Sequence, residues 1–256
     1  MPNRRSEPKE LRSRYITYTL QRRKRKTIAI HVERNGAVRV LAPSRTPLEA
    51  VEAFVDRKSG WIDRKLKEFA RLPAPAAIAL REGGELPYLG GVLRLRLVRG
   101  RGDARLLLPG GGEREAQGEL HLPANRNAGE SAIHRKINEW YLHESRRLFA
   151  EVANSLAPAA SLLGIPEPRE LSTRRMRRRW GSCLPQGKII LNSELLGAPK
   201  ECIAYVIAHE ICHLKEANHS GRFYALMEQM EPEWRELRRR VNAEAPLGFL
   251  QPPDPS

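Results

Sequence analysis

The segment Tyr205 to Leu214, YVIAHEICHL, decides how this sequence is interpreted. It contains His209 and His213, and residues four apart lie on the same face of a helix. Both imidazoles can therefore reach one metal ion, while Glu210 lies beside them. A third candidate ligand, His219, follows six residues after His213, across a segment long enough to leave the helix and turn back.

Three imidazoles around an open fourth position are typical of catalytic zinc. We therefore expect His209, His213 and His219 to bind Zn²⁺ in preference to manganese, nickel or cobalt. Zinc lowers the pKa of bound water, and Glu210 is expected to act as the general base toward that water. The pattern predicts a zinc-dependent hydrolase. The alternatives are histidines on an ordinary surface helix and a structural metal site.

The neighbouring sequence predicts a mainly helical second half. Apolar residues recur at helical spacing from Ser131 to about Leu156, and Pro199 can open the metal-binding helix, which ends near Glu216. Ser220 can cap a helix to about Met230, and Pro232 opens a last one. A strand pair is expected at 171–180 and 188–192.

The first half shows strand patterns at 15–20, 27–32 and 37–41, with a turn at Asn35-Gly36. One helix is expected over about 47–70, and then the connector 72–77. Four more strand candidates, 85–89, 92–98, 104–108 and 119–122, predict a small antiparallel sheet. Nothing indicates a nucleotide-binding βαβ unit or an organic cofactor.

Composition limits the functional class. The 256 residues carry a formal net charge of +15, which makes nucleic acid or nucleotides candidate partners, although a solvated basic surface is an equal alternative. No apolar run approaches the roughly 20 residues that cross a bilayer, and no stretch is typical of a signal peptide. Three cysteines do not indicate a disulfide framework. We expect a cytoplasmic protein with no membrane partner.

Several motifs share a resemblance to one family: RKTIAIHV with GAVRVLAP near the N-terminus, RRWGSC (178–183), KIILNSELL (188–196), YVIAHEICHL (205–214) and NHSGRFYALM (218–227). On these residues the chain resembles the YgjP-like metal-dependent hydrolases, which are relatives of the SprT-like and Wss-type zinc proteases. The resemblance implies that His209, His213 and His219 are the zinc ligands and that Glu210 is the catalytic acid and base.

The strand and helix patterns, taken together with this resemblance, lead us to expect a fold and a set of domains. We expect an α+β protein with a small β-rich N-terminal part and a zincin-like, mainly helical metallopeptidase domain with a short antiparallel sheet. The expected division is a flexible basic tail (1–14), a β-rich region with one helix (15–125), the HExxH metallopeptidase-like domain (126–245) and a frayed Pro-rich tail (246–256).

Three functions stay open at this point. The first is a zinc metallopeptidase that acts on protein or peptide substrates, in some relatives on proteins bound to DNA. The second is a metal-dependent pyrophosphatase for a nucleotide, UTP, because YgjP-like proteins have also been labelled in this way. The third is a nucleic-acid-binding protein with a structural zinc site, which the intact Glu210 argues against.

Substrate contacts are expected in two places. In the protease relatives an edge strand before the metal helix binds extended substrate, so Ile189, Ile190, Leu191 and Asn192 are candidates; an ordinary core strand is the alternative. Tyr224, after the third ligand, could donate to an oxyanion or simply pack.

An arginine-rich run precedes Trp180 and is a further candidate site. If 171–180 is a strand, Arg175, Arg177 and Arg179 share one face. Arginine forks suit phosphate, so Arg177 and Arg179 are expected to bind polyanion. A solvated edge that resists aggregation is the alternative.

Overall fold

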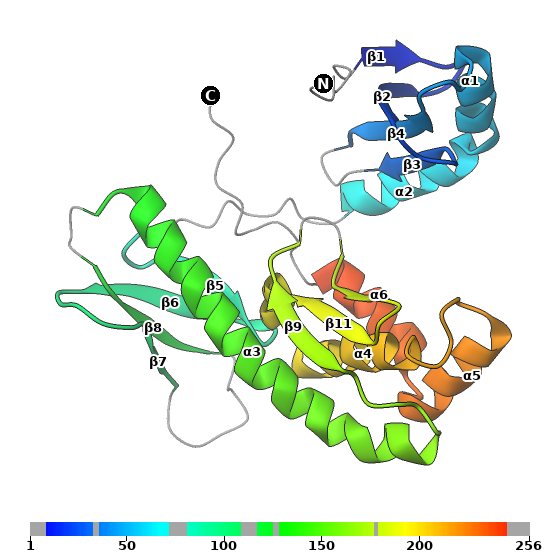
Figure 1. The fold of residues 1–256 in the computed structure, drawn as a ribbon. Coiled ribbons are helices and arrows are strands. Elements are labelled where there is room, and N and C mark those ends of the chain that lie inside the picture. The colour runs from blue at the N-terminus through cyan, green and yellow to red at the C-terminus, as the bar shows by residue number, and fades with distance from the viewer. Residues whose placement is uncertain are drawn as a thin grey trace, which may run out of the picture. The chain divides into compact units, whose positions relative to one another are not determined.

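The computed structural model describes residues 9–32, 36–71, 81–108, 117–124, 128–176 and 179–244 (Figure 1). The chain divides into two compact units, 1–74 and 75–256. The boundary after residue 74 differs from the predicted boundary, which lay after residue 125. The reason is that the second group of strands shares one hydrophobic core with the helices that follow it, and not with the N-terminal strands.

The first unit is a four-stranded sheet with two helices. Its strands, in the order β1-β2-β4-β3, are β1 (Lys9–Arg12), β2 (Thr17–Arg23), β3 (Ala29–Val32) and β4 (Val38–Pro43). Alternating residues such as Tyr18, Leu20, Val38 and Val40 are buried, and they form a core with Val51 and other side chains of the helices.

Two predictions for this unit were wrong in detail. The predicted helix over 47–70 is two helices, α1 (Leu48–Arg57) and α2 (Ser59–Arg71), because Lys58 ends α1 outside the helical conformation. The predicted tail 1–14 contains β1, which pairs antiparallel with β2. Residues 1–8 and the predicted frayed tail from 246 lie outside the described residues.

The second unit begins with a sheet against a long helix. Its strands, in the order β5-β6-β8-β7, are β5 (Glu85–Tyr88), β6 (Gly91–Val98), β7 (Arg105–Leu107) and β8 (Gln117–Pro123). The predicted antiparallel sheet is mixed, because β6 and β8 run parallel. Leucines of β6 and β8 share a core with α3 (Glu130–Leu162), which Figure 1 shows passing along this sheet and on toward the next.

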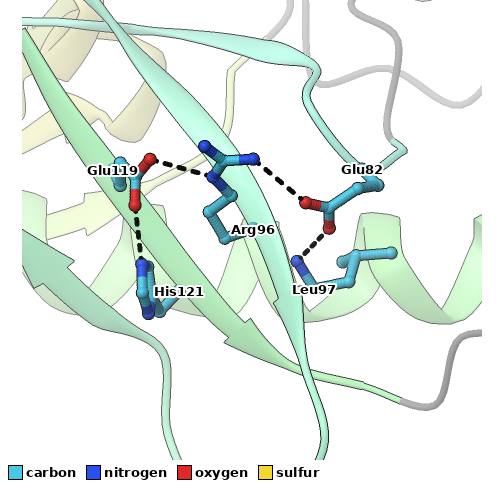
Figure 2. Close-up of polar contacts among 5 residues, drawn as sticks. All are labelled: Glu82, Arg96, Leu97, Glu119 and His121. Carbon is cyan, nitrogen blue, oxygen red and sulfur yellow. Dashed lines mark hydrogen bonds and ion pairs between the residues drawn. The ribbon is translucent and has the colours of Figure 1, made fainter.

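The other face of this sheet carries an ion-pair network (Figure 2). Arg96 Nε donates to Glu119 Oε1 at 2.8 Å, and Glu119 Oε2 lies 2.9 Å from His121 Nε2. Glu82 accepts from the backbone N–H of Leu97 at 2.6 Å and lies 3.5 Å from Arg96. The network joins β6, β8 and the turn before β5, and its half-exposed position makes it a modest contributor to stability.

A small mixed sheet follows α3 in the chain. Its strands, in the order β10-β11-β9, are β9 (Glu170–Arg174), β10 (Gly181–Cys183) and β11 (Lys188–Asn192). β11 pairs with β10 antiparallel and with β9 parallel. The strand that was predicted over 171–180 ends at Arg174. Residues 177–178 lie outside the described residues.

Four helical segments complete the unit: the 3₁₀ turn η1 (Ser193–Gly197), α4 (Lys200–Cys212), α5 (Gly221–Met230) and α6 (Trp234–Glu244). The metal-motif helix α4 is apolar on most sides and is almost wholly buried in the core of the unit. The predicted cap of α5 is confirmed, since Ser220 Oγ accepts from the N–H of Phe223. The mixed helices and small sheets confirm the predicted α+β class. None of the helices in the described part of the chain has the length and hydropathy required to cross a bilayer.

Candidate active site

The three predicted histidines converge at one point. His209 and His213 lie on one face at the end of α4, and His219 returns to them just before α5. One ligand atom from each lies within 4.8 Å of those of the other two. His209 Nε2 and His219 Nε2 are 3.0 Å apart. Two nitrogens that bind one zinc ion tetrahedrally lie roughly 3.3 Å apart, so the donor set fits such an ion.

The loop that brings His219 back is fixed at both ends. His213 ends α4, and its Nδ1 donates to the carbonyl of Glu216 at 2.9 Å. A carbonyl can only accept, so Nδ1 carries the proton and the lone pair of His213 is on Nε2. At the far end Ser220 caps α5, and the buried ring of Phe223 lies 4.5 to 4.9 Å from all three imidazoles.

Burial favours the neutral form of His209 and of His219. It lowers the pKa of His209 to about 3, with further lowering by His213, His219 and Arg238. Burial also lowers the pKa of His219, and His213 adds to the effect. Neutral imidazoles present lone pairs, which is the form that binds a metal ion.

Glu210 is a buried carboxyl beside this cluster, with 6% of its surface exposed. Burial raises its pKa to about 7, although a hydrogen bond from the backbone N–H of Cys183 and the charge of Arg179 lower it in part. A Cβ built on Gly181 would lie 2.6 Å from Oε1 and Cγ of Glu210. Only glycine at position 181 therefore leaves room for this carboxyl.

The strand that contacts Glu210 has an open edge. Trp180 C=O accepts from Asn192 N–H, and Leu184 N–H donates to Lys188 C=O, each at 2.8 Å, so these even-numbered residues face β11. The N–H and C=O groups of successive residues point to opposite edges of a strand, so those of Gly181 and Cys183 face away from β11. Among the described residues no strand pairs with that edge of β10.

The open edge borders a cleft of about 970 Å³ that also holds the histidines and Glu210. Its walls come from β10 and the turn after it, the segment before β9, and the loop between the second and third ligands. The lining residues are Pro166, Glu167, Arg169, Arg179, Gly181, Ser182, Cys183, Leu184, Pro185, Gln186, Gly187, His209, Glu210, His213, Leu214, Lys215, Ala217 and His219.

The predicted substrate strand requires correction. Ile189, Ile190, Leu191 and Asn192 belong to β11, which is central and hydrogen-bonded on both sides. All four are buried, so β11 has no edge to offer a peptide. β10 occupies the edge position instead, because the chain turns back at Gly187 and covers β11 on the side of the cleft.

The other residues predicted to contact substrate do not all lie in the cleft. Arg179 lines the cleft, whereas Arg177 lies outside the described residues. Tyr224 does not line the cleft; its ring stacks on Trp234 at 5.0 Å and 18°. Arg175 is half-buried after the end of β9, so the predicted common strand face with Arg179 is not formed.

Two residues of the site were not predicted as such: Gly181 and the backbone of Cys183. The sequence held one signal for them, since both lie in the RRWGSC motif. Their approach to Glu210 depends on the pairing of β10 with β11, which one sequence does not specify.

Comparison with known proteins identifies a family. Residues 26–244 match the family model described as YgjP-like, metallopeptidase domain. The chain belongs to the YgjP-like family. A similar solved structure is the metallopeptidase zymogen of Pyrococcus abyssi abylysin, with 27% identity over 35% of this chain and 90% of that chain, and a TM-score of 0.32. No curated protein matches the chain.

This YgjP-like chain therefore carries a metallopeptidase domain, which supports the chemistry of a metal-dependent hydrolase. The His209, His213 and His219 cluster is a set of side chains able to bind the metal ion.

Proposed function

We propose that this protein is a zinc metallopeptidase that cleaves extended peptide segments in the cleft beside β10. One observation carries the proposal: three converging imidazoles and a buried carboxyl open onto a cleft that is bordered by a strand edge with no partner strand among the described residues. An all-nitrogen donor set of three histidines favours zinc over magnesium or calcium.

The metal site and Glu210 have different roles in the proposed hydrolysis. A zinc ion held by His209, His213 and His219 would lower the pKa of water and polarise the scissile carbonyl. Glu210 has a pKa of about 7, so its carboxyl both accepts and releases a proton near neutral pH. It can take a proton from the attacking water and give it to the departing amine. The N–H of Cys183 holds the carboxylate in position for this transfer.

The edge of β10 supplies a reason to favour peptide substrates. A peptide in extended conformation adds to an open strand edge through its backbone, whatever its side chains. The Gly181 backbone and the C=O of Cys183 lie on this edge next to Glu210, while the Cys183 N–H donates to Glu210 itself. A peptide paired there brings a peptide bond to the proton-transfer group.

The experiment compares the wild-type protein with Glu210→Gln. Both are expected to bind about one equivalent of zinc, because Glu210 is not among the ligand atoms, and only the wild type should cleave casein. The loss expected for the variant is at least about 100-fold in kcat. Pyrophosphate release from UTP without cleavage of any protein would overturn the peptidase assignment in favour of the nucleotide pyrophosphatase.

We also propose that the first unit binds nucleic acid through its positive charge. Residues 1–74 contain 19 Lys and Arg against 8 Asp and Glu, a net charge of +11, whereas residues 75–256 contain 26 against 22, or +4. At the end of β2 and in the segment after it, Arg23, Lys24 and Lys26 are exposed. Clustered cations of this kind bind phosphate backbones without sequence preference.

A further inference from the structure

Arg179 stands out among the charged side chains of the cleft. It lies two residues before Gly181, at the start of the open edge of β10. Its side chain is exposed in the cleft, and among the described residues no carboxylate is within ion-pair distance of it. A guanidinium that makes no ion pair with the described part of the chain, and that lies beside the reacting groups, is available to a substrate anion.

The backbone holds this arginine in place. The Nδ2 group of the fully buried Asn192 donates to the Arg179 carbonyl at 2.9 Å and to the Met176 carbonyl. A residue whose main chain is fixed in this way presents its side chain from one position, which lowers the entropy cost of pairing with a ligand. The charge of Arg179 reaches Glu210, so the guanidinium is close to the carboxyl that handles the proton.

The rest of the cleft adds positive charge. Arg169 and Lys215 also line it, against Glu167 as the exposed acid, and the Lys215 ammonium donates to the Leu163 carbonyl at 2.6 Å. Glu167 is close in sequence to Arg169, so these two charges offset each other at one end of the cleft. At the Arg179 end, the described lining residues include the buried Glu210 but no exposed acid.

We propose that Arg179 makes this peptidase selective for acidic segments, by pairing with an Asp or Glu of the substrate on the C-terminal side of the scissile bond. This inference rests on the proposed peptidase function. β10 runs from Gly181 to Cys183, and antiparallel pairing is the more stable kind, so the substrate runs in the opposite direction. Its residues after the scissile bond then lie at the Gly181 end, beside Arg179.

The test is the sequence preference of cleavage. The zinc-loaded wild type and Arg179→Glu are incubated with a diverse peptide mixture, and the cleaved ends are identified by mass spectrometry. For the wild type, Asp and Glu should be enriched about fivefold or more within three residues after the cleaved bond, and not before it. Arg179→Glu should transfer the preference to Lys and Arg at the same positions.

Arg174→Glu is the matched control, because this exposed arginine of β9 does not line the cleft. It should keep the wild-type preference. On single peptides, Arg179→Gln should lower kcat/KM about tenfold more for an acidic peptide than for its neutral Gln analogue, and Arg179→Lys should restore most of the preference for the acidic peptide.

Two results would overturn the inference and differ from failure of the proposed function. Equal cleavage of acidic and neutral peptides by the wild type would refute selectivity and keep the peptidase. Equal losses on both peptides in Arg179→Gln would make Arg179 part of the general catalytic machinery. Failure of the wild type to exceed Glu210→Gln on any peptide would refute the peptidase function itself, and the inference with it.

Discussion

At the scale of single residues, the site depends on how closely backbone approaches a carboxyl. Gly181 lets β10 pass against Glu210, and the N–H of Cys183 orients the same group. The buried carboxyl has its pKa near 7 because it is removed from water, while the hydrogen bond and Arg179 limit the rise. The glycine is thus as much a part of the site as the ionisable groups.

Gly181→Ala tests this approach. The added Cβ would lie 2.6 Å from Glu210, which is closer than real Cβ contacts, so the carboxyl must move. We expect zinc content to stay unchanged and kcat to fall by roughly 10- to 100-fold, because small displacements of a proton-transfer group carry costs of this order. Steady-state kinetics on casein measures the effect.

The control is Gly129→Ala, whose Cβ would enter open space. It should leave kcat unchanged. An unaltered kcat in Gly181→Ala, with both variants folded by circular dichroism, would show that Glu210 does not need its present position.

At the scale of elements, Asn192 joins the end of β11 to the segment that leads into β10. Its side chain accepts from the N–H of Met176 and of Glu194, and donates to the carbonyls of Met176 and Arg179. The residue is fully buried. One amide thus fixes the chain before β10 and caps η1, so its role is positional and not the substrate contact that the sequence predicted.

We expect Asn192→Ala to destabilise the protein by about 3 kcal/mol. Four backbone groups, one buried and three partly buried, would lose their partner, and each unsatisfied group costs about 1 kcal/mol. Urea unfolding followed by tryptophan fluorescence gives the change in the free energy of unfolding.

Asn138→Ala is a suitable comparison, since within the described residues the Asn138 amide is hydrogen-bonded to the ring of His134 in the same helix and to no backbone group. Its expected loss is below about 1 kcal/mol. Equal losses in the two variants would contradict the positional role of Asn192.

At the scale of the whole molecule, most of the positive charge and the metal cluster belong to different units. The metal cluster and the cleft are made entirely by the second unit, with its net charge of +4, and most of the positive charge of the chain is in the first. Nucleic-acid affinity and peptidase activity should therefore respond to different substitutions.

The combined variant Arg23→Gln, Lys24→Gln and Lys26→Gln should weaken binding to duplex DNA and flatten its salt dependence. Each phosphate contact contributes about 0.9 to the slope of log K against log salt, so the slope should fall by up to about 3. Fluorescence anisotropy at several salt concentrations measures this, and casein cleavage should be unaffected.

The matched control neutralises three exposed arginines of the second unit, Arg99, Arg101 and Arg105. It removes the same charge and should leave the slope close to the wild-type value. A larger effect of this control would place the DNA-binding surface in the second unit.

The sequence by itself determined the local features. Helical spacing placed His209 and His213 on one face, Ser220 was recognisable as a cap, and the return of His219 was expected from the length of the loop. These are short-range properties, set by backbone periodicity and by groups a few residues apart. The α+β class followed in the same way from periodic patterns.

Only the tertiary structure decided which strand is the edge, where the units divide and which backbone groups meet Glu210. The apolar pattern of Lys188–Asn192 suits an edge strand or a central one, because it records burial and not the number of paired neighbours. Pairing of β10 with β11, and the shared core of the second sheet with α3, arise between residues distant in the chain. Such contacts depend on how whole elements pack, which local spacing does not encode.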